Sequence, residues 1–494
     1  MAEVEVERLS TGVPGLDEVL FGGLIPGLTY VVTGGPGAGK TTLAMHFAMA
    51  AEQAREKALY VTLKDPERQV RRNARALGLN LDGVTFLDLS PAPEMVAREE
   101  PYQVFAPADV EKMPLVHAIR AALEADQPRR VIIDSINILR YLSAEPYQFR
   151  QLAISLMRLV TRTGATLLAP VEATAEQPES ELQFIAEAVI ELQQTPIGRK
   201  VRVIKFAGSG YLPGEHSLAL TGSGMLVFPR LVPSTHRRQY TYTAVPSGIR
   251  ELDEMLHGGL ERGTFTVISG PTGAGKTTFG LQFMKEAARR GDRSVVYSFE
   301  ENPEAIRTRA EGIAIPIGDM LAHGTLSLVR IEALQYSPDE FVYQVRQEVE
   351  QRDARVIMID GLEGYKLSIR MHGGDVVGHL HALAEYLNNM GVAGILTADV
   401  SAITGSFHIT EESISYLADD IIFLRWLEMG GALHRVVGVL KKRLTGHERT
   451  LREFDITPEG LKLGLPIEGA YGILTGVATP IGAGAEPVRV EAAR

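Results

Sequence analysis

Two glycine-rich segments of this sequence have the spacing of a phosphate-binding loop. They run from Gly34 to Thr41 and from Gly270 to Thr277, and both fit the pattern Gly-x-x-x-x-Gly-Lys-Thr. In such loops backbone N–H groups point at phosphate oxygens, the lysine reaches the β- and γ-phosphates, and the hydroxyl residue binds Mg²⁺. We therefore expect two sites for ATP and Mg²⁺, formed by Gly35, Gly37, Ala38, Gly39, Lys40, Thr41, Thr42, Gly273, Ala274, Gly275, Lys276, Thr277 and Thr278.

Each site needs a carboxylate to complete the magnesium site, usually an aspartate at the end of an apolar strand. Asp134 and Asp360 each follow a short apolar run. An isolated aspartate in this position is most often a turn former or a helix cap. Beside an intact loop in both copies the metal role is favoured, so we expect Asp134 and Asp360 to hold Mg²⁺ together with Thr41 and Thr277.

Hydrolysis also needs a group that orients or deprotonates the attacking water. Glu300 and Glu301 stand after the strand expected to follow the second loop, whereas Lys64 and Asp65 take their place in the first copy. Acidic residues also favour the first turn of a helix, which explains the charge of Glu300 and Glu301 but not its absence at Lys64. Because a lysine cannot act as a carboxylate base, the sequence predicts two unequal sites.

The two loops belong to an internal repeat, in which residues 11–47 align with 247–283 without a gap, at an offset of 236. In both copies short β-branched runs alternate with longer helix-like segments, which is typical of a mostly parallel sheet with helices on both faces. We predict an α/β fold with a first domain at 1–230, a linker at 231–245, a second domain at 246–464, and a C-terminal extension at 465–494 that is flexible after about 476. The basic residues 236–238 are interpreted as solvated linker rather than as a contact site.

The composition limits the classes of function. The 494 residues include 61 Asp plus Glu and 50 Lys plus Arg, a formal charge of −11, which argues against strong nucleic-acid binding. Cysteine is absent, so disulfides and thiol catalysis are excluded. No stretch approaches 18 uncharged apolar residues, and we expect a cytoplasmic protein with no membrane partner.

The paired loops, the preceding pattern Gly-x-x-x-Leu-Asp-x-x-x-x-Gly-Gly and the run Phe299-Glu300-Glu301 resemble the KaiC family of RecA-like ATPases. The resemblance implies two tandem RecA-like P-loop NTPase domains and a double-ring homohexamer with ATP between subunits. It also implies slow ATP hydrolysis, autokinase activity in the circadian clock members, and KaiB-like or two-component signalling proteins as partners.

In that family a Lys-x-Arg pair from the neighbouring subunit approaches the γ-phosphate. Lys441 and Arg443 match the pair in the second copy, whereas the first copy has Lys205 and Ala207. Without the resemblance, residues 441–443 would be a solvated basic strand end. The family's base matches Glu300, so the resemblance makes Glu300, Glu301, Lys441 and Arg443 the catalytic residues, and we expect the first domain to hold ATP and the second to hydrolyse it.

The clock members phosphorylate a Ser-Thr pair in the second domain. The resemblance places Ser415 and Tyr416 at this pair and Thr410 at a further hydroxyl position. Tyr416 departs from threonine, and an ordinary helix or turn serine is an equal alternative for Ser415. The family therefore implies a serine/threonine autokinase reaction that the residues support only in part.

A RecA/RadA-like ATPase that binds DNA is the alternative from another class. Its support is the basic segment after Asp360, which contains Lys366, Arg370 and His372. The acidic balance of the chain opposes it, as does the lack of an equally basic segment after Asp134.

Overall fold

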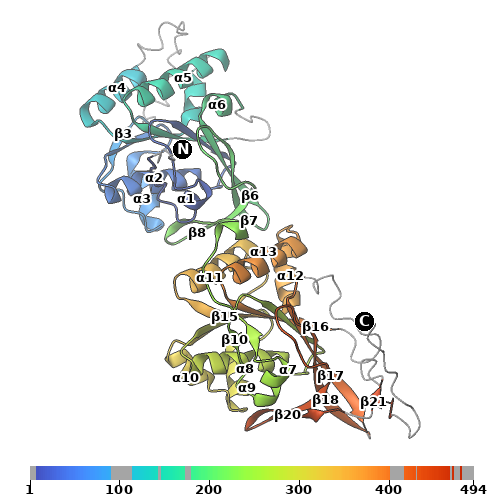
Figure 1. Cartoon of the computed structure of the whole chain (residues 1–494). Helices are drawn as coiled ribbons and strands as arrows, with labels where there is room; N and C mark the ends of the chain where they lie inside the picture. Colours follow the sequence, from blue (N-terminus) through green and yellow to red (C-terminus); the bar gives the residue numbers. More distant parts are fainter. Residues whose placement is uncertain are drawn as a thin grey trace. The chain divides into compact units, whose positions relative to one another are not determined.

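A computed structural model describes residues 7–90, 114–142, 146–172, 180–400, 417–429, 431–467, 470–471 and 479–480. The chain divides into two compact units, 1–230 and 231–494 (Figure 1). Each unit is built around one nine-stranded sheet.

In the first unit helices and strands largely alternate along the chain, and the last four strands follow one another directly. In order, they are α1 (Leu16–Val19), β1 (Thr29–Gly34), α2 (Lys40–Gln53), β2 (Ala58–Thr62), α3 (Glu67–Ala76), β3 (Thr85–Asp88), α4 (Pro114–Asp126), β4 (Arg130–Asp134), η2 (Ile136–Leu142), α5 (Pro146–Arg162), β5 (Thr166–Glu172), α6 (Ser180–Ile185), β6 (Ala188–Thr195), β7 (Gly198–Phe206), β8 (His216–Thr221) and β9 (Gly224–Phe228).

The second unit has the same number and order of sheet strands, together with further short helices and strands. It comprises η3 (Pro233–Thr235), β10 (Ala244–Val245), α7 (Arg250–Met255), β11 (Leu260–Glu261), β12 (Phe265–Gly270), α8 (Lys276–Arg289), β13 (Arg293–Ser298), α9 (Pro303–Glu311), α10 (Ile317–Ala322), β14 (Leu326–Arg330), α11 (Pro338–Glu350), β15 (Ala354–Asp360), α12 (Leu362–Met371), α13 (Val376–Asn389), β16 (Ala393–Asp399), β17 (Asp420–Met429), β18 (Ala432–Lys441), β19 (Arg452–Thr457), β20 (Gly460–Pro466), β21 (Ala470–Tyr471) and β22 (Thr479–Pro480).

The two sheets have the same topology. The strand orders are β3-β2-β4-β5-β1-β6-β7-β8-β9 and β14-β13-β15-β16-β12-β17-β18-β19-β20. In each sheet the first six strands of this order run parallel and the remaining three are added antiparallel. The predicted fold class, two mostly parallel α/β domains of RecA-like type, is confirmed.

Helices cover both faces of the second sheet (Figure 1). On one face, side chains of α11, α12 and α13 such as Phe341, Tyr365 and Leu383 form one apolar core. On the other face, side chains of α8 and α10 such as Phe283 and Met320 form a second core. Because both faces are covered, the central strand β12 is buried along its whole length, as expected of a parallel strand.

The phosphate-binding loops join the central strands to the first long helices. Gly39 and Gly275 precede α2 and α8 with φ of 108° and 103°, a left-handed conformation that favours glycine. A β-carbon at Gly39 would lie 2.8 Å from Met225 Cε, and one at Gly275 would lie 2.8 Å from Ile456 Cδ1. Glycine is therefore favoured at this position in both loops by its conformation, and a side chain there would also have to displace the end of Met225 or Ile456.

The basic residues before β10 pack on the second unit. Arg238 donates to Asp353 Oδ1 over 2.6 Å, and its backbone N–H donates to Asn389 O over 3.0 Å. His236 Nδ1 lies 3.2 Å from Glu350 Oε1. The interpretation of His236 and Arg238 as solvated is therefore wrong, because Glu350 and Asp353 bind their side chains.

Candidate functional site

The second phosphate-binding loop brings its lysine into contact with an acidic residue that the sequence analysis missed. Lys276, the first residue of α8, is 9% exposed. Its Nζ donates to Pro271 O over 3.2 Å and to Asp399 Oδ1 over 2.6 Å. Asp399 ends β16, whose register places it opposite Gly270 at the end of β12. Its signal in the sequence is the same as that of Asp360, an acidic residue that ends an apolar run.

Thr277 and Asp360 lie together beside this lysine. Thr277 Oγ1 donates to Asp360 Oδ1 over 3.0 Å, and Thr397 Oγ1 donates to the same oxygen over 2.8 Å. Burial raises the pKa of Asp360, while the two hydroxyl hydrogen bonds lower it. A hydroxyl and a carboxylate at a loop that can bind phosphate are the protein ligands that a magnesium–nucleotide complex uses, so the residues present fit such a complex.

Glu300 lies over the residue that follows Asp360. A β-carbon at Gly361 would be 2.7 Å from Glu300 Cγ and 2.9 Å from its carboxyl carbon. Partial burial raises the pKa of Glu300, and the negative charges of Asp399 and Asp360 raise it further, whereas Lys276 lowers it. A carboxylate with a raised pKa is a stronger base at the edge of this cluster.

Glu301 points to a different partner. Its carboxylate forms a salt bridge with Arg309 of α9, with Oε2 2.6 Å from Nη1. The side chain of Glu301 thus pairs with α9, although its charge also raises the pKa of Asp360. Glu300, on which the charges of Asp399, Asp360 and Lys276 act, remains the candidate for the base.

The first loop lines a cavity of about 360 Å³ together with Thr41, Asp134 and Glu172. Lys40 Nζ donates to the backbone oxygens of Gly34 and Gly35, both over 2.8 Å. Burial raises the pKa of Asp134, and hydrogen bonds from Tyr60 and Thr41 lower it. The Thr–Asp pair is therefore common to both units, and the first one also fits a magnesium–nucleotide complex.

Lys64 occupies the place in the first unit that Glu300 occupies in the second. Lys64 lies two residues after the end of β2, and Glu300 lies two residues after the end of β13. In each unit the residue between, Leu63 or Phe299, donates its N–H to the backbone oxygen of the aspartate that ends the neighbouring strand of the sheet, Asp134 or Asp360. Lys64 Nζ lies 3.6 Å from Glu172 Oε2. The two units thus share the backbone geometry at this position, but the first has a positively charged residue, Lys64, where the second has a negatively charged one, Glu300. This is the asymmetry that the sequence predicts.

Lys441 at the end of β18 and Arg443 just after it lie at the end of the sheet opposite the phosphate-binding loop. Lys441 Nζ donates to Ala418 O, and Arg443 Nη1 donates to Asp419 Oδ1 over 2.9 Å. Asp419 also accepts from the N–H of Phe265, which begins β12. Since β12 has 6 residues, this end of the sheet lies roughly 20 Å from the loop after Gly270. Lys441 and Arg443 are therefore remote from the phosphate-binding loop of their own unit.

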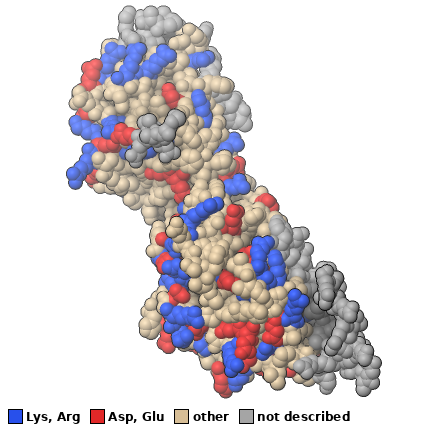
Figure 2. Space-filling view, viewed as in Figure 1, with Lys and Arg blue, Asp and Glu red and all other residues tan. Residues whose placement is uncertain are grey.

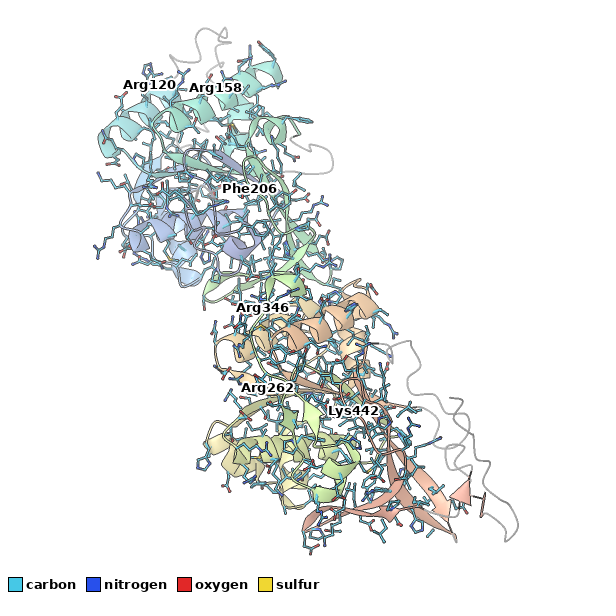
Figure 3. All side chains as sticks on the ribbon, in the orientation of Figure 1. Arg120, Arg158, Phe206, Arg262, Arg346 and Lys442 are labelled. Atoms are coloured by element: carbon cyan, nitrogen blue, oxygen red, sulfur yellow. The ribbon has the colours of Figure 1, made fainter. Side chains whose placement is uncertain are left out.

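Lys442 differs from its two neighbours. Its side chain has 0% exposure and forms an ion pair with Glu261. Figure 3 labels Lys442 within the second unit. The alternative of a solvated basic strand end is therefore wrong for Lys442. In the first unit Lys205 Nζ donates to Ala186 O over 2.7 Å, so it lies as Lys441 does, while Ala207 provides no counterpart of Arg443.

The segment on which the DNA-binding alternative depended forms α12. Lys366 is 2% exposed and its Nζ lies 2.7 Å from Glu363 Oε1. His372 Nδ1 contacts Ser368 O over 2.8 Å. Figure 2 shows acidic and basic side chains interspersed on the visible face of the second unit. Lys366 is therefore unavailable to a phosphate backbone.

Three candidate residues lie outside the described part of the chain. They are Thr410, Ser415 and Tyr416, the candidate phosphoacceptors. Within the described ranges no helix is long and apolar enough to cross a membrane.

Comparison with known proteins agrees with the repeat. The KaiC ATPase family matches residues 9–232 and again residues 245–466. The circadian clock protein KaiC3 of Synechocystis sp. is 26% identical over 490 residues, which cover 95% of this chain and 94% of that protein. The circadian clock oscillator protein KaiC of Acaryochloris marina is 25% identical over 496 residues, which cover 97% and 92%. Since the match recurs in both halves and covers most of the sequence, this chain belongs to the KaiC family of ATPases.

Proposed function

We propose that this chain hydrolyses Mg-ATP mainly in its second unit and holds ATP in its first. The observation that carries the proposal is the exchange of Glu300 for Lys64 at equivalent positions beside otherwise matching Thr–Asp pairs. A base contributes about 10² to 10⁴ to the rate, so its loss from the first site outweighs small differences elsewhere.

In the second unit Lys276 and the backbone of the loop would bind the β- and γ-phosphates, and Thr277 and Asp360 would hold magnesium. The metal, when bound, neutralises charge on the phosphate oxygens. Glu300 would orient the attacking water and accept its proton, because its raised pKa favours proton transfer.

We further propose that the active form is a homohexamer with ATP between subunits. The support is the distance of Lys441 and Arg443 from the loop of their own unit. A cation that reaches the γ-phosphate from a neighbour accelerates phosphoryl transfer by about 10³ to 10⁵. Arg443 supplies such a group in the second unit, and Ala207 cannot supply it in the first.

The family likeness extends the proposal to signalling or circadian-type timing in the cytoplasm, with KaiB-like or two-component signalling proteins as partners. It also includes serine/threonine autokinase activity at Ser415, with Tyr416 and Thr410 as further acceptors. Incubation with Mg-ATP followed by phosphopeptide mass spectrometry tests the autokinase proposal. Phosphate at Ser415 supports it, and ADP production without any phosphopeptide overturns it.

Turnover of Glu300→Gln against the wild-type chain tests the assignment of the base. We expect ADP production to fall at least about 100-fold, since a general base contributes at least that factor. The control is Glu301→Gln, which removes the neighbouring carboxylate that is paired with Arg309. Undiminished turnover in Glu300→Gln would show that the second unit does not hydrolyse ATP through this residue.

The RecA/RadA-like alternative is not favoured, because the family match is to KaiC and Lys366 is buried in an ion pair. A titration with DNA at two salt concentrations tests it, since binding through phosphates weakens steeply as salt rises.

A further inference from the structure

The two sites differ in how an acidic residue at the end of a neighbouring strand is neutralised. Glu172 lies opposite Gly34 in the β1–β5 register, and Asp399 lies opposite Gly270 in the β12–β16 register. Strand pairing thus identifies them as equivalent positions, although the offset between them is 227 rather than 236. Both place a carboxylate beside the loop that binds phosphate.

In the second unit this carboxylate binds the lysine of the loop. Asp399 Oδ1 lies 2.6 Å from Lys276 Nζ, and the pair is mostly buried, with 10% of the lysine side chain and 31% of the aspartate side chain exposed. A lysine in this loop serves the β- and γ-phosphates. Phosphate must therefore compete with Asp399 for the same ammonium group.

In the first unit another lysine binds the carboxylate. Glu172 Oε2 lies 3.6 Å from Lys64 Nζ, while Lys40 donates to two backbone oxygens of its own loop. Asn137 fixes the backbone of Glu172, accepting from its N–H over 2.6 Å and donating to its oxygen over 3.0 Å. Glu172 is thus held near the loop with Lys64 as its partner, and this pair is more exposed than the one in the second unit, with 55% of the lysine and 37% of the glutamate side chain exposed.

We propose that Asp399 and Glu172 set the nucleotide affinity of their sites by competing with phosphate for the loop lysine, and that Lys64 removes this competition in the first site. Lys64 is then a positioning residue that acts through Glu172. This inference rests on the proposed function in that both sites bind ATP. The first site then binds ATP more tightly than the second, because Lys64 is the partner of the competing carboxylate there.

The first test is a double-mutant cycle on Lys64 and Glu172 in the full chain. The second site is disabled with Lys276→Ala and Thr277→Ala, and ATP competes with a fluorescent ATP analogue. We expect Lys64→Met to weaken ATP binding about tenfold, which equals about 1.4 kcal/mol. The double variant Lys64→Met/Glu172→Gln should return to within about threefold of the parent, which is less than 1 kcal/mol.

The cycle separates this role from direct contact between Lys64 and the γ-phosphate. A lysine that touches phosphate directly remains missing in the double variant, so binding would stay weak and the proposal would be overturned. Lys64→Arg serves as the conservative control and should keep the parental affinity. The thermal unfolding midpoint of each variant is compared with that of the parent. Equal midpoints show that a change in affinity does not come from a change in folding.

The second test is the matching cycle in the second site, with the first site disabled by Lys40→Ala and Thr41→Ala. We expect Asp399→Asn to tighten ATP binding about tenfold when Lys276 is present and to have little effect in Lys276→Met. Equal tightening in both backgrounds would mean that Asp399 merely repels phosphate, and the competition would be excluded. Asp399→Glu should retain the weak binding.

These outcomes are distinct from failure of the proposed function. The cycles report ATP binding rather than ADP production, so Asp399→Asn can tighten binding even if Glu300→Gln leaves hydrolysis undiminished. Conversely, loss of hydrolysis in Glu300→Gln with unchanged affinity in both cycles would support the function and overturn the competition.

Discussion

The side chain of Glu300 occupies the space where a side chain at Gly361 would lie. A β-carbon at Gly361 would lie 2.7 Å from Glu300 Cγ, closer than carbon atoms pack, and the glycine also has a φ of +104°. Since Gly361 directly follows Asp360, this contact places the carboxylate of Glu300 near the residue that we propose to hold magnesium. The position of the proposed base therefore depends on a residue without a side chain.

The first prediction is that Gly361→Ala lowers turnover by displacing Glu300. Loss of a well-placed base costs about 10² to 10⁴, so we expect kcat to fall at least about tenfold even if displacement is partial. ATP binding should change little, because the lysine and threonine of the loop are untouched. Steady-state ADP production and equilibrium binding of ATP measure the two quantities.

Gly373→Ala is the matched control for this variant. Gly373 also has a positive φ, +69°, but no atom lies within 4 Å of its expected β-carbon. It therefore adds a side chain at a glycine with positive φ without a contact to Glu300. Equal loss of turnover in both variants would attribute the effect to strain and would contradict the assignment.

The second prediction concerns repair of the first site. Lys64→Glu alone should leave first-site turnover low, because Ala207 supplies no cation for the γ-phosphate. Lys64→Glu combined with Ala207→Arg should raise it above that of either single variant. ADP production is measured with the second site disabled by Glu300→Gln, and a double variant no faster than Lys64→Glu would show that other residues limit the first site.

The third prediction is a shift in the pH dependence of hydrolysis. Glu300 must be deprotonated to act as a base, and partial burial and then Asp399 raise its pKa above the ordinary value for glutamate. Turnover should therefore fall on acidification at a higher pH than an unperturbed glutamate would give. Asp360, Lys276 and Glu301 also contribute charge at this position.

Asp399→Asn removes one of the charges that raise the pKa of Glu300, so the acid limb of kcat should move to lower pH. The control is Glu332→Gln, an exposed residue outside the site that pairs with Arg330. If kcat falls at the same acidic pH in Asp399→Asn as in the wild-type chain, the fall reflects the titration of a group other than Glu300.

The sequence predicts the repeated fold and most of the second site because these depend on local patterns. The loops are contiguous, Asp360 ends the buried strand β15, and Glu300 lies two residues after the end of β13. Asp399 was missed because its relation to Lys276 depends on the pairing of β12 with β16, across 123 residues. The burial of Lys442 was missed for the same reason, since Glu261 lies 181 residues away.

The fourth prediction concerns the ion pair between Lys442 and Glu261. Both side chains are almost fully buried, with 0% and 8% exposure, and Asp420 lies in the same cluster. Removing one partner of a buried pair leaves an uncompensated charge, so Lys442→Met should lower the free energy of unfolding by about 3 kcal/mol at neutral pH. Lys462→Met is the control, because Lys462 and Glu459 form an exposed pair worth less than about 1 kcal/mol.

The loss in Lys442→Met should also depend on pH in a defined direction. Burial, and then the charge of Glu261, raise the pKa of Asp420 to about 6. A carboxyl group whose pKa is higher in the folded state stabilises the fold at low pH, and this contribution is lost as pH rises through 6. Lys442 offsets the negative charge of Asp420, so its removal should cost more at pH 7 than at pH 5. Denaturant unfolding at the two pH values measures the difference, and equal losses would place the cost in packing of the lysine stem rather than in its charge.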